Sequence, residues 1–133
     1  MSAHTLTSVL EKYEAAMIRH GGVVWGSFDC LHMAVEATAA AGRSDLSGEL
    51  PVYFSEFTAA RALARMHFAS LRDALDRFGK RVAPGSARPG DIAWMIESDG
   101  EALGVVIGAE AAFLHPQGLL RRAVSSLEVW RLG

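Results

Sequence analysis

The sequence contains very little cysteine, and this scarcity excludes several kinds of protein. Cys30 is the only cysteine among 133 residues. The chain can therefore form no internal disulfide and no zinc site built from several thiolates. No pair of histidines has the spacing of a common metal motif either. We expect no bound metal and no cofactor.

Long hydrophobic runs and an excess of one charge are also missing. No apolar stretch approaches the roughly 18 residues that span a bilayer, and residues 1–7 lack the order of a signal peptide. The 13 basic and 15 acidic residues give a formal net charge of −2, which argues against a protein that binds phosphate backbones. These absences predict a soluble chain that neither inserts into a membrane nor binds nucleic acid.

The remaining composition is typical of one compact domain. Half of the residues are hydrophobic and 21% are charged, the usual balance of a globular protein. A chain of 133 residues can bury a sizeable core without disulfides or metals. We predict a single domain over residues 1–133.

The helical signals are confined to the first part of the chain. Helical spacing and cap residues predict helices over 5–19, 30–41, 55–66 and 70–78, with a loop at 43–54. Residues 82–90 are rich in proline and glycine and predict turns. Closely spaced β-type runs follow at 92–96, 103–107, 112–114, 119–124 and 127–132. The predicted fold class is α+β: helices first, then a small antiparallel sheet or half-barrel.

The segment Trp25-Gly-Ser-Phe-Asp-Cys30 carries the strongest chemical signal. Asp29 is a good N-cap, so Cys30 falls in the first turn of the second predicted helix. The positive dipole end and free N–H groups of a helix N-terminus lower the pKa of a thiol and can stabilise an oxyanion. Cys30 is therefore a candidate nucleophile, and a buried structural thiol is the alternative.

Four segments in this order resemble the NlpC-type cell-wall peptidases, a bacterial branch of the papain-like fold. They are residues 25–30, 87–92, 102–108 and 113–119. The first resembles the nucleophile segment of that family, and the second resembles the Pro-Gly-Asp turn before the first sheet strand. The third is similar to the Gly-x-x-x-Gly strand that begins with the catalytic histidine. In the fourth, His115 matches the histidine that orients the catalytic one.

This resemblance implies a papain-like NlpC-type fold, but the chain departs from the family at the general base. Ala102 stands where the resemblance places the catalytic histidine, and an alanine cannot transfer a proton. Losing one such transfer typically slows a reaction by about 10²–10⁴-fold. The resemblance leaves Cys30 as nucleophile and His115 as the residual polar partner. Trp25 and Asp29 are the expected substrate contacts.

The pattern is also similar to small NlpC-like proteins encoded in phage and prophage tail operons. The similarity lies in chain length, in residues 53–65 and in the closing residues 129–132. It implies synthesis in the bacterial cytoplasm and a place in the virion tail, with other tail-tip or baseplate proteins and peptidoglycan as partners.

Two functions follow from this resemblance. One is hydrolysis of stem-peptide amide bonds in peptidoglycan through a thioester during cell-wall penetration. The other is a catalytically inactive subunit of the tail tip that retains the fold for assembly contacts.

The other histidines and the tryptophans carry weaker signals. His32 lies two positions after Cys30 on the same predicted helix and projects about 200° away, so it cannot be the partner of the thiol. His20 is expected at a helix C-terminus, where a cation is favoured. Trp25, Trp94 and Trp130 either line a cleft or anchor the core.

Overall fold

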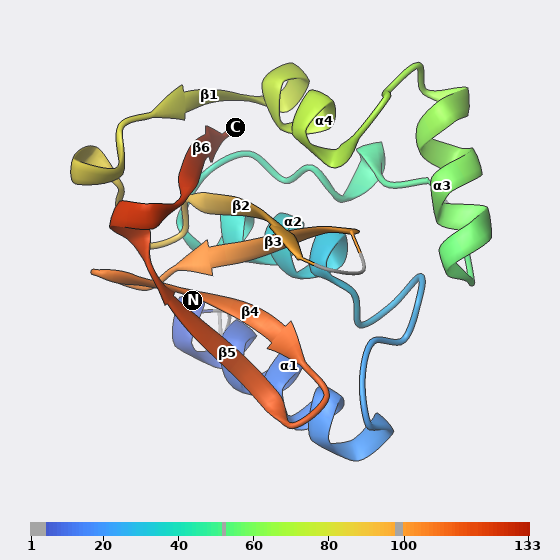
Figure 1. The fold of residues 1–133 in the computed structure, drawn as a ribbon, viewed down its shortest axis with the longest axis horizontal. Coiled ribbons are helices and arrows are strands. Elements are labelled where there is room, and N and C mark those ends of the chain that lie inside the picture. Colours follow the sequence, from blue (N-terminus) through green and yellow to red (C-terminus); the bar gives the residue numbers. More distant parts are fainter. Residues whose placement is uncertain (1–4, 52, 98–99) are drawn as a thin grey trace.

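A computed structural model describes residues 5–51, 53–97 and 100–133 (Figure 1). In this part of the chain the helices are α1 (Leu6–His20), α2 (Cys30–Ala40), α3 (Glu56–Arg65) and α4 (Leu71–Phe78). The strands are β1 (Gly79–Val82), β2 (Ile92–Glu97), β3 (Gly100–Val106), β4 (Glu110–His115), β5 (Gly118–Ala123) and β6 (Glu128–Leu132). Short 3-10 helices occur at Ser47–Glu49, Pro84–Ser86 and Val124–Ser126.

The six strands form one open antiparallel sheet in the order β1-β6-β2-β3-β4-β5. Strands β2 to β5 follow one another as a meander, and β6 then returns to lie between β1 and β2. Helices followed by an antiparallel sheet confirm the predicted α+β class. No helix of the described residues is both long and apolar enough to cross a membrane.

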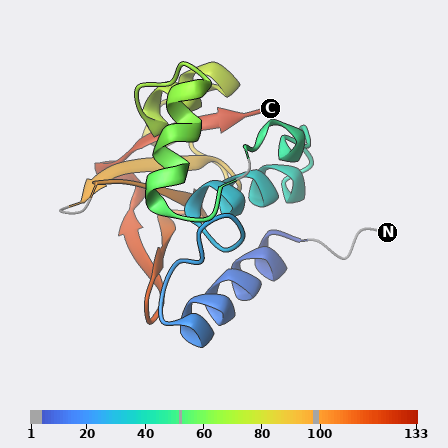
Figure 2. The ribbon, with the colours of Figure 1, turned by 90° about the vertical axis from the view of Figure 1, so that its right-hand side faces the viewer.

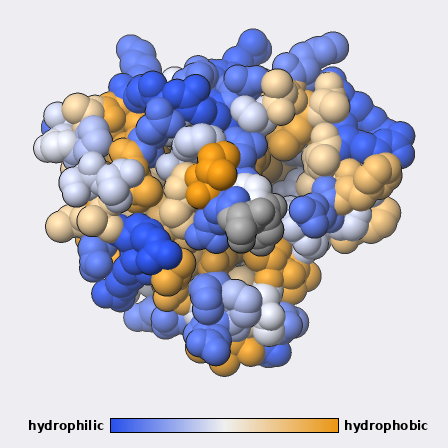
Figure 3. Space-filling view, in the orientation of Figure 1, coloured by the Kyte–Doolittle hydropathy of each residue, from blue (hydrophilic) through white to orange (hydrophobic). Residues whose placement is uncertain are grey.

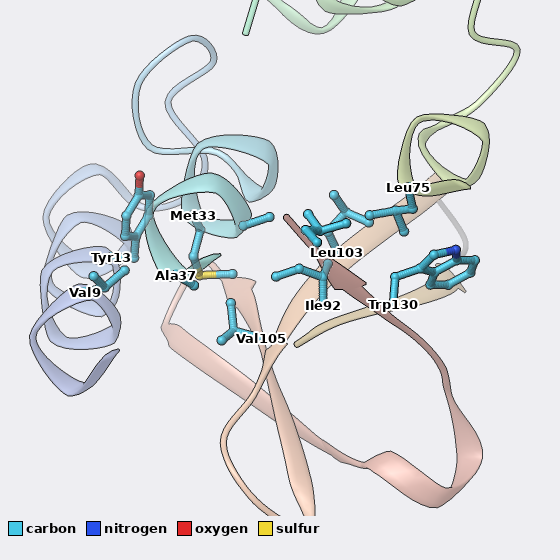
Figure 4. Close-up of a cluster of buried hydrophobic side chains, with 11 residues drawn as sticks. Val9, Tyr13, Met33, Ala37, Leu75, Ile92, Leu103, Val105 and Trp130 are labelled. Carbon is cyan, nitrogen blue, oxygen red and sulfur yellow. The ribbon is translucent and has the colours of Figure 1, made fainter. Parts of the chain in front are cut away.

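The helices α1, α2 and α4 pack on one face of this sheet, with α2 against β3, α1 against β5, and α4 against β1 and β6. Figure 2 shows α1 and α2 together on one side of the strands. Figure 4 shows the core that results: Tyr13 of α1 lies beside Met33 of α2, Leu103 of β3 lies between α2 and α4, and Leu75 of α4 lies above Trp130 of β6. This core holds α2 firmly against the sheet.

A second, smaller core covers the opposite face of the sheet. It comprises Ala93, Val106, Ala111, Phe113, Val124 and Val129. Neighbours along one strand alternate between the two cores, as Val105 and Val106 do on β3. The sheet is therefore buried on both faces in its centre, although helices cover only one of them.

Side-chain caps begin all four of these helices, and one of them is Asp29, the N-cap that the sequence predicts. Thr5, Asp29, Ser55 and Ser70 each accept a hydrogen bond from the backbone N–H three residues later. Such a cap contributes about 1 kcal/mol. At its far end α1 stops at Gly21, whose φ of 69° is left-handed. The predicted helix limits agree with the structure to within one or two residues.

The strand β1 was not predicted from the sequence. Gly79 does end α4, as its C-cap, but it also begins a strand that pairs with β6. Lys80 and Arg81 in this strand are exposed, so the segment lacks the apolar alternation that indicates a strand. Charged residues are common on an edge strand because they discourage pairing with other chains.

A buried carboxylate ties the start of β2 to its neighbours. Asp91 is fully buried, and its Oδ1 accepts hydrogen bonds from Arg43 (2.6 Å) and from Arg131 Nε (3.0 Å). Its Oδ2 accepts from the Arg88 N–H at 2.8 Å. Burial alone would raise the pKa of Asp91, but the bonds from Arg131, Arg88 and Arg43 outweigh it and lower the pKa. The Pro-Gly-Asp turn is thus a structural junction.

Candidate functional site

The turn before α2 is closed by its own backbone. Val24 and Phe28 form an isolated antiparallel bridge. Gly26 has a φ of 88°, and a Cβ on it would collide with the carbonyl oxygen of Tyr53. Only glycine fits this position, because it tolerates the left-handed backbone and the close approach together. This turn fixes the direction in which α2 starts.

Asp29 caps α2 with a carboxylate whose two oxygens are both used inside the protein. Oδ1 accepts from the His32 N–H at 2.9 Å and lies 2.8 Å from His32 Nδ1. Oδ2 accepts from the Gly26 N–H at 2.8 Å. Burial acts to raise the pKa of Asp29, but the bonds from His32, Gly26 and Tyr53 prevail and lower it. The expected substrate contact therefore lines the cleft, yet serves as a structural cap.

Cys30 is the first residue of α2, as the sequence predicts, and it lines a cleft of about 370 Å³. The residue is partly exposed, but its sulfur is poorly solvated. Burial raises the pKa of the Cys30 thiol to about 11, and the charges of Asp29 and Glu101 add to the rise. Hydrogen bonds from the backbone N–H groups of Leu103 and of Cys30 itself act in the opposite direction but are outweighed.

The cleft lies between α3 and the end of the β2–β3 hairpin. Its α3 wall includes Glu56, Ala59 and Leu63. The hairpin wall comprises Glu97 and residues 100–103. Figure 3, in the orientation of Figure 1, shows the surface hollowed between these two elements. Trp25, an expected substrate contact, stands at the rim with 38% of its surface exposed.

The expected histidine partner lies elsewhere. His115 ends β4 and does not line the cleft, and its Nδ1 accepts the Gln117 N–H at 3.1 Å. Ala102 does line the cleft, on the same wall as Leu103. The His32 ring instead contacts Asp29 and Tyr53, with Nδ1 2.8 Å from Asp29 Oδ1 and 3.3 Å from the Tyr53 hydroxyl. Within residues 5–51, 53–97 and 100–133, no histidine lines the cleft.

Two residues of the site were not singled out from the sequence. The Tyr53 hydroxyl lies 3.3 Å from His32 Nδ1 at the cleft wall. Glu101 accepts the backbone N–H groups of Leu71 (2.9 Å) and Arg72 (3.1 Å) at the start of α4. It also accepts from Trp94 Nε1 at 2.7 Å. Both are isolated polar residues in the sequence, and their roles depend on contacts between distant segments.

The other two tryptophans serve the core rather than the cleft. Trp130 is fully buried and donates from Nε1 to Asp76 at 2.8 Å. Trp94 is half-buried and packs against the main core. His20 is the last residue of α1, as predicted, and stacks on Phe28.

The chemistry available to this site is limited by the protonation of the Cys30 thiol. With a pKa of about 11, only about one thiol in 10⁴ is ionised at neutral pH. The thiolate is the reactive form of cysteine, so Cys30 is a weak nucleophile here. No group of three potential metal ligands occurs among the residues that the structure describes. What the site offers instead is a large cleft in which a ligand can bind.

Comparison with known proteins gives one match. The model of a family described as a domain of unknown function, DUF6950, matches residues 3–132. No curated protein and no solved structure matches the chain. Because the family model covers almost the whole sequence, the chain belongs to the DUF6950 family.

Proposed function

We propose that this chain is a papain-like protein of the NlpC type that acts as a non-cleaving subunit of a phage-type tail tip. Its cleft binds a partner in the place where a peptidase of this type would bind substrate. The peptidase fold is then retained as a building block, and peptide hydrolysis is not its task.

The arrangement of the four family-like segments supports the NlpC-type assignment. Cys30 begins a helix that packs on β3, and the Pro-Gly-Asp turn leads directly into β2. Ala102, at the expected position of the general base, lines the same cleft as Cys30. These placements are those that the family resemblance implies for a nucleophile helix and the strand facing it.

The observation that carries the non-cleaving function is the thiol without a proton-transfer partner. Burial raises the pKa of Cys30 to about 11, and no histidine among the described residues lines the cleft. Amide cleavage needs a thiolate to attack the carbonyl and an acid to protonate the leaving amine. The cleft supplies neither at neutral pH.

The peptidase function is the second candidate, and one observation favours it. Cys30 lies at the N-terminus of α2, and hydrogen bonding from the backbone N–H groups of Leu103 and Cys30 acts to lower the pKa of its thiol. Hydrolysis would form a thioester with release of the amine, and water would then regenerate the thiol. Without an imidazole, the proton for the amine would have to come from solvent.

Incubation with purified peptidoglycan separates the two candidates. We expect the wild-type protein and Cys30→Ala to release no more soluble muropeptide than a buffer control. Cys30→Ala is the matched variant, because it removes the sulfur from the cleft and changes little else. Release by the wild type that is absent in Cys30→Ala would overturn the non-cleaving function.

The assignment to a tail needs a separate measurement. We expect mass spectrometry of tail-like particles, purified from the bacterium that encodes the chain, to detect it at a fixed stoichiometry to the other tail proteins. Detection only in the soluble fraction of the cell, with none in the particles, would contradict this location.

A further inference from the structure

We propose that the cleft binds an extended segment of a partner protein in which a lysine or arginine adjoins an aliphatic residue. This inference rests on the proposed function, in which the cleft binds a chain without cutting it. It follows from three features of the cleft: two exposed apolar side chains in its lining, two carboxylates on opposite walls that form no ion pair with the residues that the structure describes, and four leucines that also line a neighbouring apolar pocket.

Two exposed apolar side chains line this cleft. Val23 and Trp25 are 40% and 38% exposed. Phe54, Phe57 and Ile96 are also exposed, but they do not line the cleft. Exposed apolar residues at a concave site are typical of a surface that binds another protein.

The negative charge of the cleft favours a ligand with a cationic side chain. Four carboxylates line it, from Asp29, Glu56, Glu97 and Glu101, and no lysine or arginine of the described residues does so. Asp29 and Glu101 are hydrogen-bonded inside the protein. Glu56 on α3 and Glu97 on β2 are exposed and have no ion-pair partner in the part of the chain that the structure describes. A cationic side chain between them would complement both, with the Trp25 ring available for a cation–π contact.

The leucines of the cleft favour an aliphatic side chain beside the cation. Leu31, Leu63, Leu71 and Leu103 line both the cleft and a neighbouring apolar pocket of about 50 Å³. These four leucines offer an aliphatic side chain an apolar surface, and its burial there favours binding.

Binding of short labelled peptides to the full chain, followed by fluorescence anisotropy, tests this proposal. The probe is an acetylated and amidated peptide with the sequence Gly-Ser-Lys-Leu-Ser-Gly. We expect replacement of its lysine by glutamate to weaken binding at least about tenfold, and replacement of its leucine by serine to weaken it by a similar factor. Raising the salt from about 50 to about 500 mM should also weaken it.

Matched variants locate the binding in the cleft. Glu56→Gln and Glu97→Gln should each weaken binding about 2- to 5-fold, as expected for an exposed ion pair. Glu110→Gln, an equally exposed carboxylate at the start of β4, should change nothing.

Several outcomes would overturn the inference. They are no binding of the lysine–leucine peptide at about 1 mM, equal binding of the lysine and glutamate peptides, or binding of soluble muropeptides without any binding of linear peptides. The proposed function fails on a different result, Cys30-dependent release of muropeptides from peptidoglycan. The two failures are therefore distinguishable.

Discussion

Cys30 and His115 are the pair that the family resemblance joins in one site, and their surroundings differ. Cys30 begins α2, lines the cleft and accepts a hydrogen bond from the Leu103 N–H. His115 ends β4, lies outside the cleft lining and binds the Gln117 N–H of its own turn. The first residue has the setting of a nucleophile, whereas the second has the setting of a turn residue.

The two positions differ in how closely they are tied to the rest of the fold. The place of Cys30 follows from a short turn, a glycine and the Asp29 cap, which also hold the protein together. A proton-transfer partner would come from a separate strand, where Ala102 stands at the position that the resemblance assigns to it. In the proposed assignment, the turn and the cap therefore keep Cys30 in place although no histidine of the described residues lines the cleft.

Among the substitutions considered, placing an imidazole in the cleft should change the reactivity of Cys30 most. Ala102→His puts a histidine on the wall that Cys30 also lines. A cation beside the sulfur stabilises the thiolate, so alkylation of Cys30 by iodoacetamide at about pH 7.5 should accelerate about 10- to 100-fold. Ala60→His, which enters the same cleft from α3, is the matched control. An equal acceleration in both variants would contradict the special position of Ala102.

Removing the charge of Asp29, the N-cap of α2, should have the next largest effect, which is a loss of stability. Asp29→Asn weakens bonds to Gly26 and His32 in a buried site, and we expect a loss of about 1–3 kcal/mol in unfolding free energy. The pKa of Asp29 is below its ordinary value in the folded state. Its stabilisation is therefore complete above about pH 4 and is lost as the pH falls through the folded pKa.

Chemical denaturation at several pH values measures this loss. The gap between wild type and Asp29→Asn should be widest near neutral pH and should narrow below about pH 4. A gap that stays constant down to the acid limit would contradict the assigned role of the Asp29 charge.

The Glu101 charge should have a smaller effect on the thiol. Glu101 raises the pKa of Cys30 through its negative charge, so Glu101→Gln should lower that pKa and speed alkylation at about pH 9 by about 2- to 3-fold. The variant retains an oxygen that can cap α4. Glu128→Gln changes a half-buried carboxylate that pairs with Arg72 and should leave the reactivity of the thiol unchanged. A similar effect of both variants would refute the local origin of the pKa change.

The smallest effect on the Cys30 thiol is expected from a substitution of His115. His115→Gln should leave the alkylation rate of Cys30 within about twofold of wild type between about pH 6 and pH 9, because the histidine binds its own turn. A drop of tenfold or more would show that the imidazole reaches the sulfur in solution.

Local signals in the sequence were sufficient for the helices and for the place of the thiol. Asp29 caps the helix that it was expected to cap, and the predicted limits of the helices agree with the structure to within one or two residues. The strand β1 was not predicted because its central residues, Lys80 and Arg81, are exposed and charged. Its pairing with β6, some fifty residues later, is what makes it a strand.

The rest of the site could not be predicted because it is built from distant segments. Tyr53 reaches His32 across 21 positions and Glu101 reaches Leu71 across 30, and neither spacing leaves a local pattern. The raised pKa of Cys30 has the same origin. A helix N-terminus favours the thiolate, but burial by other segments outweighs it.

The pH profile of Cys30 alkylation tests the central claim most directly. The rate in the folded wild-type protein should still rise about tenfold per pH unit up to about pH 10, without a plateau, because the pKa of the thiol is about 11. A plateau below about pH 8 that disappears in His115→Gln would show an activated thiolate with an imidazole partner, and would contradict the account.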